Sequence, residues 1–376
     1  MGVGPPRSRG RSRYVVLCTG ARGVPVPRVF TSEEAAVNPT VNRQIVLASR
    51  PPAMPTADNF RLEEKPVPEP GPGEVLVRNI YMSVDPYMRG RMRDAKSYAT
   101  PWAVGKPCDG RAVGRIIRSK HPTFATGDYV SSMLGWREHF VSSGEGLVRL
   151  DLSLAPLPAY LGVLGIPGFT GWYGLTEIGR PKAGETLVVS GAAGATGSLV
   201  GQMGKILGCR VVGTAGTDDK CAHLTRDLGF DAAVNYRTAG DLYGALRQAC
   251  PDGVDVYFEN VGGAVLEAVL RCLNPFARIP LCGMISQYNQ DPPEPGPRYL
   301  FSLVGNRVLV QGFIISDHFE RYPEFLRQAG GWLEAGRLKH QETIVEGLEN
   351  APRAFLGLFK GENLGKMLVR LAPEEG

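Results

Sequence analysis

The sequence predicts an α/β protein in which an antiparallel β domain precedes a doubly wound parallel sheet. Three observations predict this class. The chain has 376 residues, enough for two or three domains. Short strands bounded by Gly and Pro occupy its first part, and after about residue 162 apolar strands alternate with helices. Alternation of this kind builds a parallel sheet with helices on both faces.

Composition excludes several classes of protein. Hydrophobic residues make up 43% of the chain and charged residues 21%, which is typical of a globular protein rather than a disordered one. The net charge of +5 forms no dense basic stripe, so we expect no nucleic-acid partner. The most apolar stretch, residues 159–169, is too short to span a membrane, and we expect no membrane association. Seven cysteines stand singly, with no C-x-x-C pair, and favour a reduced, cytoplasmic protein.

Residues 1–43 are predicted to be a disordered leader. They are rich in Arg, Gly, Pro and Ser, contain no acid before Glu33, and show no helical or strand periodicity. An organelle transit peptide would also be rich in Arg and poor in acid. However, Pro5, Pro6, Pro25 and Pro27 disfavour the amphipathic helix that such a peptide needs.

The remaining chain divides into three predicted segments. Residues 44–161 form the antiparallel β domain, with expected strands at 44–48, 75–80, 112–117 and 128–130. Residues 162–329 form the parallel-sheet domain, with expected strands at 186–190, 210–214, 232–234, 254–258 and 277–281, and helices at 198–207, 218–228 and 265–272. Residues 330–376 end in an apolar strand at 365–371, which we expect to return to the first domain.

A glycine-rich turn lies between the first strand and the first helix of the parallel-sheet domain. Gly191, Gly194 and Gly197 have the spacing G-x-x-G-x-x-G. Glycines here let the backbone approach a pyrophosphate, which the free N–H groups of the helix N-terminus stabilise. Such turns also occur for tight packing alone, but the strand–turn–helix context favours dinucleotide binding.

The next strand indicates which dinucleotide is bound. It ends at Gly213-Thr214-Ala215-Gly216 without the Asp or Glu that usually accepts a hydrogen bond from a free ribose 2′-hydroxyl. Small residues leave room for a 2′-phosphate, and Lys220 could supply positive charge. Asp218 and Asp219 could instead contact a hydroxyl, or could simply stabilise the first turn of a helix. On balance the sequence favours NADPH over NADH.

Seven segments carry a family resemblance: residues 83–89, 161–170, the glycine turn at 191–197, 258–263, 282–289, 311–315 and 361–366. In this order they resemble the zinc-free branch of the medium-chain dehydrogenase/reductase superfamily. Within that branch the chain is similar to NADPH-dependent curcumin reductases, prostaglandin reductases and plant alkenal double-bond reductases.

The resemblance implies a GroES-like antiparallel β domain and a Rossmann domain that binds NADPH, with the active site between them. The implied reaction is hydride transfer to the β-carbon of an enone or enal, a small-molecule substrate. The implied cofactor contacts are Gly194, Ala195, Thr196 and Gly197 at the pyrophosphate, Lys220 and Tyr236 at the 2′-phosphate, Asn260 at the ribose, Cys282, Gly283, Ile285, Ser286, Tyr288, Phe313, Ile314 and Ile315 at the nicotinamide, and Asn363 from the C-terminal segment.

Tyr288 is the catalytic candidate, because its phenol could donate a hydrogen bond to the substrate carbonyl oxygen as negative charge builds there. Its alternative role is to pack against and order the cofactor. Tyr87 and Trp136 are candidates for the substrate pocket, although large aromatic residues are often simply core. No metal is expected, since Asp85 stands where zinc-dependent relatives have a cysteine ligand.

Two other functions stay open at this point. A zinc-free quinone reductase would share the fold and the cofactor but pass the hydride to a quinone ring. An NADPH-binding protein without turnover would retain the cofactor motifs alone. Relatives are commonly dimers, so a homodimer is expected.

Overall fold

The computed structural model describes residues 40–374. The predicted leader therefore lies outside the described residues, except for its last four positions. Residues 41–43 already belong to strand β1 (Val41–Leu47), which pairs with β2 (Phe60–Pro66) as an antiparallel hairpin.

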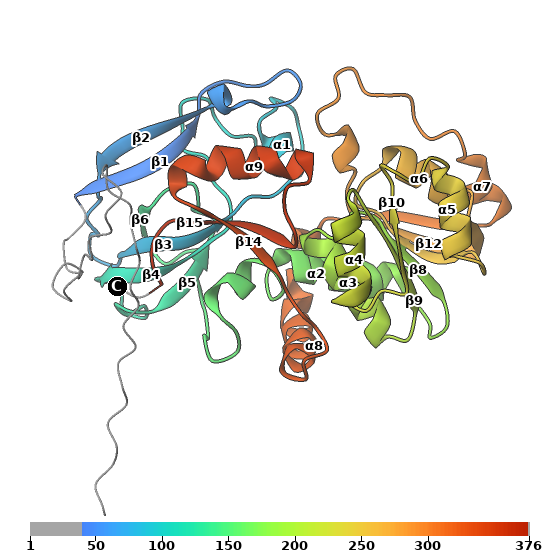
Figure 1. Ribbon diagram of the computed structural model, residues 1–376. Helices are drawn as coiled ribbons and strands as arrows, with labels where there is room; N and C mark the ends of the chain where they lie inside the picture. Colours follow the sequence, from blue (N-terminus) through green and yellow to red (C-terminus); the bar gives the residue numbers. More distant parts are fainter. Residues whose placement is uncertain (1–39, 375–376) are drawn as a thin grey trace, which may run out of the picture. The chain divides into compact units, whose positions relative to one another are not determined.

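A six-stranded parallel sheet forms the second half of the fold (Figure 1). Its strands are β8 (Thr186–Val189), β9 (Arg210–Ala215), β10 (Ala232–Asn235), β11 (Val254–Phe258), β12 (Leu273–Leu281) and β13 (Leu309–Gly312). They lie in the order β10-β9-β8-β11-β12-β13. In chain order this is the 3-2-1-4-5-6 arrangement of a doubly wound Rossmann sheet, whose order reverses between β8 and β11.

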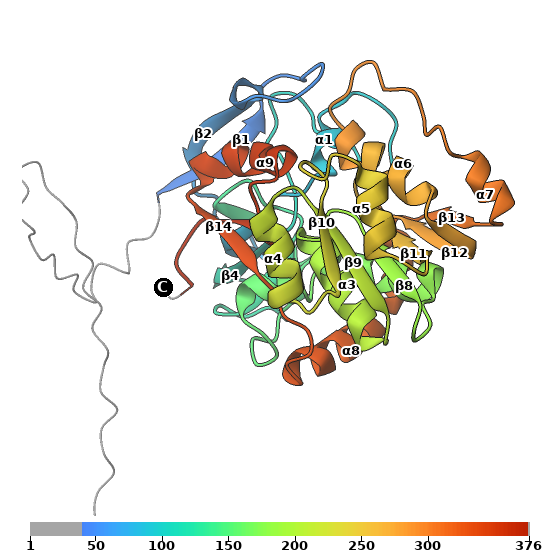
Figure 2. The same cartoon turned by 45° about the vertical axis from the view of Figure 1, so that its right-hand side comes forward.

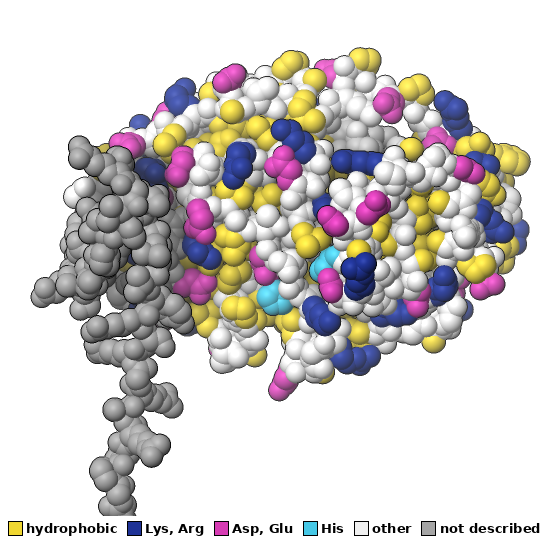
Figure 3. Space-filling model, in the orientation of Figure 1, with side chains coloured by type: hydrophobic (Ala, Val, Ile, Leu, Met, Phe, Trp, Pro, Cys, Tyr) yellow, Lys and Arg dark blue, Asp and Glu magenta, His cyan; other side chains and the backbone are white. Residues whose placement is uncertain are grey.

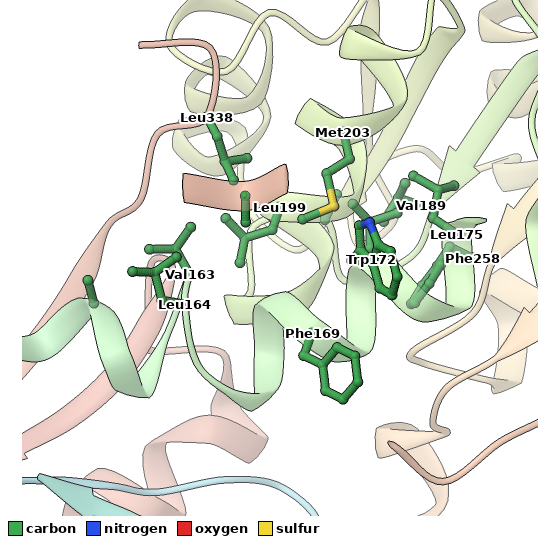
Figure 4. Packing of buried hydrophobic residues seen from close by; sticks show 14 of the residues in the cluster. Val163, Leu164, Phe169, Trp172, Leu175, Val189, Leu199, Met203, Phe258 and Leu338 are labelled. Carbon is green, nitrogen blue, oxygen red and sulfur yellow. The ribbon is translucent and has the colours of Figure 1, made fainter. Parts of the chain in front are cut away.

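Helices cover both faces of this sheet, because its strands alternate apolar side chains between two cores (Figure 2). Leu187 and Val189 of β8 belong to the core that contains α2, α3 and α4, whereas Val188 belongs to the core that contains α5 and α6. These helices are α2 (Ile166–Tyr173), α3 (Ala195–Ile206), α4 (Asp218–Arg226), α5 (Leu242–Ala249) and α6 (Gly263–Leu270). Figure 4 shows part of the first core, in which Leu199 and Met203 of α3 lie near Trp172 of α2.

The other large sheet is mostly antiparallel and has seven strands, six of them on its main path. They lie in the order β14-β15-β3-β4-β5-β7, with β6 also paired to β3. The strands are β3 (Val75–Ser83), β4 (Ala112–Ser119), β5 (Tyr129–Ser132), β6 (His139–Ser142), β7 (Val148–Arg149), β14 (Glu342–Glu346) and β15 (Lys366–Arg370). Because β15 pairs with β3, the C-terminal segment returns to the antiparallel sheet.

The remaining helices are α1 (Met88–Arg91), α7 (Phe301–Gly305), α8 (Tyr322–Glu334) and α9 (Ala351–Lys360). None of the helices among residues 40–374 has the length and apolar character needed to cross a membrane. The predicted fold class, a Rossmann sheet combined with an antiparallel β domain, is confirmed.

Candidate active site

The glycine turn lies at the carboxyl end of β8, beside the point where strand order reverses. Gly191 has a φ of 58°, in the left-handed region that favours glycine. A Cβ at Gly197 would lie 2.5 Å from the carbonyl oxygen of Gly191, so a side chain there would close the turn. Gly194 is the N-cap of α3 and offers no side chain to the first N–H groups of that helix. These N–H groups therefore fit a pyrophosphate.

Three side chains gather at the end of β9 and β10, where a 2′-phosphate is expected. A Cβ at Gly216 would lie 2.8 Å from Tyr236 Oη and 3.2 Å from Arg237 Nε. A Cβ at Gly361 would lie 3.7 Å from Lys220 Nζ and 4.0 Å from an Arg237 Nη atom. Burial and the neighbouring Arg237 cation lower the pKa of Lys220.

Neither of these cations forms an ion pair within residues 40–374. Lys220 Nζ donates to the carbonyl oxygen of Gly361 at 2.7 Å, and Arg237 donates to that of Lys360 at 3.4 Å. The nearby Asp218 carboxylate instead accepts a hydrogen bond from the Asn235 amide at 2.7 Å. The cluster therefore fits a phosphate, and its chemistry matches NADPH.

A buried carboxylate organises the loop that follows β11. Glu259 is fully buried and accepts hydrogen bonds from Ser190 Oγ at 2.6 Å, Tyr257 Oη at 2.6 Å, and the N–H groups of Val261 and Gly262. Asn260 is fixed beside it, because its amide donates to the Ser190 carbonyl oxygen at 2.8 Å. The residue predicted to contact the ribose is thus held between β8 and β11 at the reversal point.

The C-terminal segment reaches the same place. Gly365 N–H donates to the carbonyl oxygen of Ala193 at 2.9 Å, and Gly365 forms a β-bridge with Gly194. The Asn363 amide donates to the carbonyl oxygen of Gly365 at 2.8 Å. Asn363 therefore lies close to the glycine turn, although it is far from it in sequence.

Residues 282–288, predicted to line the nicotinamide, lie directly against the loop after β11. Cys282 and Gly283 donate their N–H groups to the Glu259 carbonyl oxygen, and Ser286 Oγ donates to that of Val261 at 2.6 Å. Tyr288 Oη accepts the N–H of Met284 at 3.3 Å. Burial raises the pKa of Tyr288, so its phenol stays protonated at neutral pH.

The predicted segment 313–315 follows β13, the next strand of the sheet. The ring of Phe313 lies 5.7 Å from that of Tyr173, between centroids, and packs against the first core. Ile314 caps the short 3₁₀ helix η6 (Ile315–Arg321) in an extended conformation. Both segments thus follow the carboxyl ends of neighbouring strands, β12 and β13.

Residues of the antiparallel domain contact the loop that carries Tyr288. Arg89 of α1 donates to Asn289 Oδ1 at 2.8 Å, and Arg93 donates to the carbonyl oxygen of Tyr288 at 3.0 Å. Tyr98 is 63% exposed and lies near Tyr288 and Cys282. Partial desolvation of its phenol, together with the charge of nearby groups such as Asp85, raises its pKa to about 12. These contacts fix the loop that carries Tyr288.

The two predicted pocket residues differ in their surroundings. Tyr87 is partly buried, and burial followed by the charge of Asp85 raises its pKa strongly. Trp136 has no exposed surface, and its ring packs 5.5 Å from Phe60 and 6.3 Å from Phe355. The structure therefore places Trp136 in the core of the antiparallel domain, not in a pocket wall.

No group of three or more His, Cys, Asp or Glu side chains within residues 40–374 is arranged to hold a metal ion. Asp85, at the position of a cysteine ligand in zinc-dependent relatives, forms an ion pair with Lys366 at 2.9 Å. Lys366 is 3% exposed and also donates to the carbonyl oxygen of Val84 at 2.9 Å. A buried ammonium group therefore takes up the space beside this carboxylate.

Sequence reasoning missed three residues of the site. Arg237 could have been found from its place directly after Tyr236. Glu259 could have been suspected, because it is an acidic residue directly after the apolar run Val256–Phe258 that ends β11. Tyr98 gave no signal, because its loop reaches the site through the tertiary fold.

The fold and the site together define an NADP(H)-dependent oxidoreductase. Family models describing the "N-terminal domain of oxidoreductase" and "Zinc-binding dehydrogenase" match residues 43–150 and 195–330. The chain is 48% identical over 339 residues to NADPH-dependent curcumin reductase of Escherichia coli, with 89% of this chain and 98% of the relative covered. It is 42% identical over the same length to the NADP(+)-dependent 2-alkenal reductase of Nicotiana tabacum, again with 89% and 98% coverage.

A solved structure agrees with these relatives. The crystal structure of CurA in complex with NADPH from Vibrio vulnificus matches with a TM-score of 0.84 at 47% identity, covering 88% of this chain and 99% of that one. The chain belongs to the medium-chain dehydrogenase/reductase superfamily, in the family of curcumin, alkenal and prostaglandin reductases. It is an NADPH-dependent reductase of carbon–carbon double bonds, as the sequence predicted.

Proposed function

We propose that this enzyme reduces the double bond of α,β-unsaturated ketones and aldehydes, with the hydride delivered to the β-carbon. The observation that carries the proposal is the 42–48% identity to enzymes named for curcumin and 2-alkenals. Both substrates have a carbon–carbon double bond conjugated with a carbonyl group. NADPH, when bound, supplies the hydride.

Tyr288 is the proposed catalytic residue. Hydride addition at the β-carbon leaves negative charge on the carbonyl oxygen, and a positioned phenol O–H lowers the energy of that charge by donating to it. The raised pKa of Tyr288 supports this role, because a protonated phenol is required. Arg93 supports it further by holding the backbone of Tyr288 at 3.0 Å.

Two more tyrosines belong to the proposed substrate pocket. Tyr98 lies near Tyr288, and Asp85 lies close enough to both Tyr98 and Tyr87 that its charge helps to raise their pKa values. Their rings offer flat apolar surface to a conjugated, planar substrate.

The proposed cofactor contacts follow the prediction, with one addition. The turn Gly194–Gly197 holds the pyrophosphate, Lys220 and Tyr236 hold the 2′-phosphate together with Arg237, and Asn260 and Asn363 lie on the ribose side. Cys282, Gly283, Ile285, Ser286 and Tyr288 line the nicotinamide, with Phe313, Ile314 and Ile315 on the neighbouring segment. The hydrogen bonds among these segments support this assignment.

A substrate panel tests the proposed function. NADPH oxidation is followed with an enone such as 3-nonen-2-one, an enal such as 2-hexenal, 1,4-naphthoquinone and the saturated ketone 2-nonanone, and products are identified by mass spectrometry. We expect reduction of the enone and the enal to saturated carbonyl compounds and no reaction of 2-nonanone. Turnover of naphthoquinone alone would replace the proposal with quinone reduction, and NADPH binding without turnover of any of them would contradict catalysis.

We also propose a homodimer formed through the β13 edge of the parallel sheet. All four residues of β13 are exposed, and among residues 40–374 no strand pairs with its outer side, so β13 ends the sheet. Apolar side chains around it are exposed as well, including Phe301, which is 81% exposed, and Val304 of α7. Figure 3 shows hydrophobic side chains at its right-hand end, where α7 lies in Figure 1. A second copy related by a two-fold axis would pair with this edge and cover the patch.

Light scattering coupled to size-exclusion chromatography tests the dimer. The double substitution Phe301→Glu and Val304→Glu is expected to convert a dimer into a folded monomer. Leu154→Glu, at another exposed apolar position, is the matched control and should stay dimeric. A monomeric wild type, or an unchanged dimer in the double variant, would contradict the proposed interface.

A cytoplasmic location is proposed from the cysteines. Within residues 40–374 all six are free thiols, and four of them are buried. Free thiols in this number are typical of a reducing compartment. Fractionation of the native host would test it, and recovery with an organelle or with secreted protein would contradict it.

A further inference from the structure

Arg111 is a partly buried cation at the edge of the proposed substrate pocket. It directly precedes β4, and its guanidinium carbon lies 5.7 Å from the ring centroid of Phe319. Burial lowers its pKa, yet an arginine remains charged at neutral pH. Within residues 40–374 its guanidinium forms no hydrogen bond and no ion pair, so its N–H donors are left over for another partner.

The groups around Arg111 do not neutralise it. Asp85 is the carboxylate among them, and it already binds the ammonium group of Lys366 at 2.9 Å and the hydroxyl of Ser83. The other neighbours are the phenols of Tyr87 and Tyr322, and burial raises the pKa of both. Tyr322 donates its hydroxyl hydrogen to the carbonyl oxygen of Leu164 at 2.6 Å. One positive charge is therefore left uncompensated.

The position of this charge connects it with substrate. Tyr87, one of the groups near Arg111, belongs to the proposed substrate pocket. Phe319, whose ring lies against the guanidinium, is part of η6, which begins at the last residue of the segment 313–315 proposed to line the nicotinamide. Phe319 also stacks on Phe169, with ring centroids 6.2 Å apart, so the aromatic support under the guanidinium belongs to the core. Charge, donors and rigid support are thus brought together between the two domains.

We propose that Arg111 recognises a carboxylate on the substrate, so that the enzyme prefers enones that carry an acid group at the end remote from the double bond. A guanidinium is suited to this task because its parallel N–H groups match the two carboxylate oxygens. Burial strengthens the pairing, since the cation has already lost part of its hydration. The inference rests on the proposed function and names the substrate class for that same site.

A matched pair of substrates tests the inference. (E)-8-oxonon-6-enoic acid and its methyl ester share the enone and differ in one negative charge. We expect the wild type to reduce the acid with a kcat/KM about 10- to 100-fold above that of the ester, the range for a charge-assisted bidentate pair. Arg111→Gln should abolish this preference by slowing the acid while changing the ester less than about threefold. Arg111→Lys, which keeps the charge, should restore part of it, and Arg226→Gln, an exposed control, should change neither.

Binding separates failure of this inference from failure of the proposed function. The saturated product, 8-oxononanoic acid, is titrated by calorimetry into the enzyme loaded with NADP⁺, beside its methyl ester. Tighter binding of the acid to wild type than to Arg111→Gln supports carboxylate recognition even if neither enone is reduced. Equal affinity for acid and ester, or the same preference in wild type and Arg111→Gln, would overturn it, whether or not the ester is turned over.

Discussion

Replacement of Lys220 by Ala is expected to weaken NADPH binding far more than NADH binding. Lys220 and Arg237 both approach Gly361, and each lies close enough to the other that their like charges repel. A 2′-phosphate placed between them would remove this repulsion and accept hydrogen bonds from both. NADH lacks that phosphate, so its affinity should hardly depend on Lys220.

The expected magnitude follows from the two cations. A charge-assisted hydrogen bond to phosphate contributes about 1.5 to 3 kcal/mol, which corresponds to about a 10- to 150-fold change in Kd. Lys220→Ala and Arg237→Gln should each raise the Kd of NADPH by a factor in this range. Each should change the Kd of NADH less than about threefold. The double variant should show non-additive losses, because both side chains act on one phosphate.

Fluorescence titration of the reduced cofactors measures these constants directly. Lys182→Ala is the matched control, because this exposed lysine precedes β8 at the amino end of the sheet, whereas the cofactor site lies at the carboxyl end. If Lys220→Ala left the ratio of NADPH to NADH affinity unchanged, the 2′-phosphate role of Lys220 would be refuted.

Three further predictions follow from the site. Tyr288→Phe should lower kcat/KM for 3-nonen-2-one at least tenfold with little change in the Kd of NADPH, whereas a loss under about threefold, or roughly 0.7 kcal/mol, would exclude the donor role. Because the pKa of Lys220 is lowered from 10.5, NADPH affinity should fall as pH rises through that lowered pKa. The fall should be absent in Lys220→Arg, and an identical pH profile for the wild type and this variant would contradict the prediction. Glu259→Ala leaves buried donors unpaired and should reduce the free energy of unfolding by about 2 to 5 kcal/mol in urea titrations. The control Glu294→Ala, at an exposed position, should cause no measurable change, and equal stability of the two variants would contradict the network role.

The fold could be predicted from the sequence because its signals are local. Buried parallel strands are short apolar runs, and the turn between β8 and α3 needs glycine at Gly191 for its backbone conformation and at Gly197 for space. The pairing of β15 with β3 could be anticipated only as a closing strand, since no local pattern specifies which strand accepts it.

The site was less accessible to sequence reasoning, because much of it depends on contacts between distant segments. Lys220 was found from the lack of an acid after β9, a local signal. Trp136 was expected in the pocket because its loop was placed near where substrate would enter. The φ of 62° at this residue, which no pattern reveals, accompanies its burial against Phe60 and Phe355. Arg111 and Tyr98 reach the pocket through loops whose course the tertiary fold determines.

The fate of the transferred hydrogen tests the central claim most directly. The enzyme is incubated with each epimer of NADPH deuterated at C4 and with 3-nonen-2-one, and the product is examined by deuterium NMR and mass spectrometry. The account predicts 2-nonanone carrying one deuterium at the former β-carbon, C4, from one of the two epimers. Deuterium at C2 of an alcohol product would contradict the account. A reduced product without deuterium from either epimer would contradict it as well.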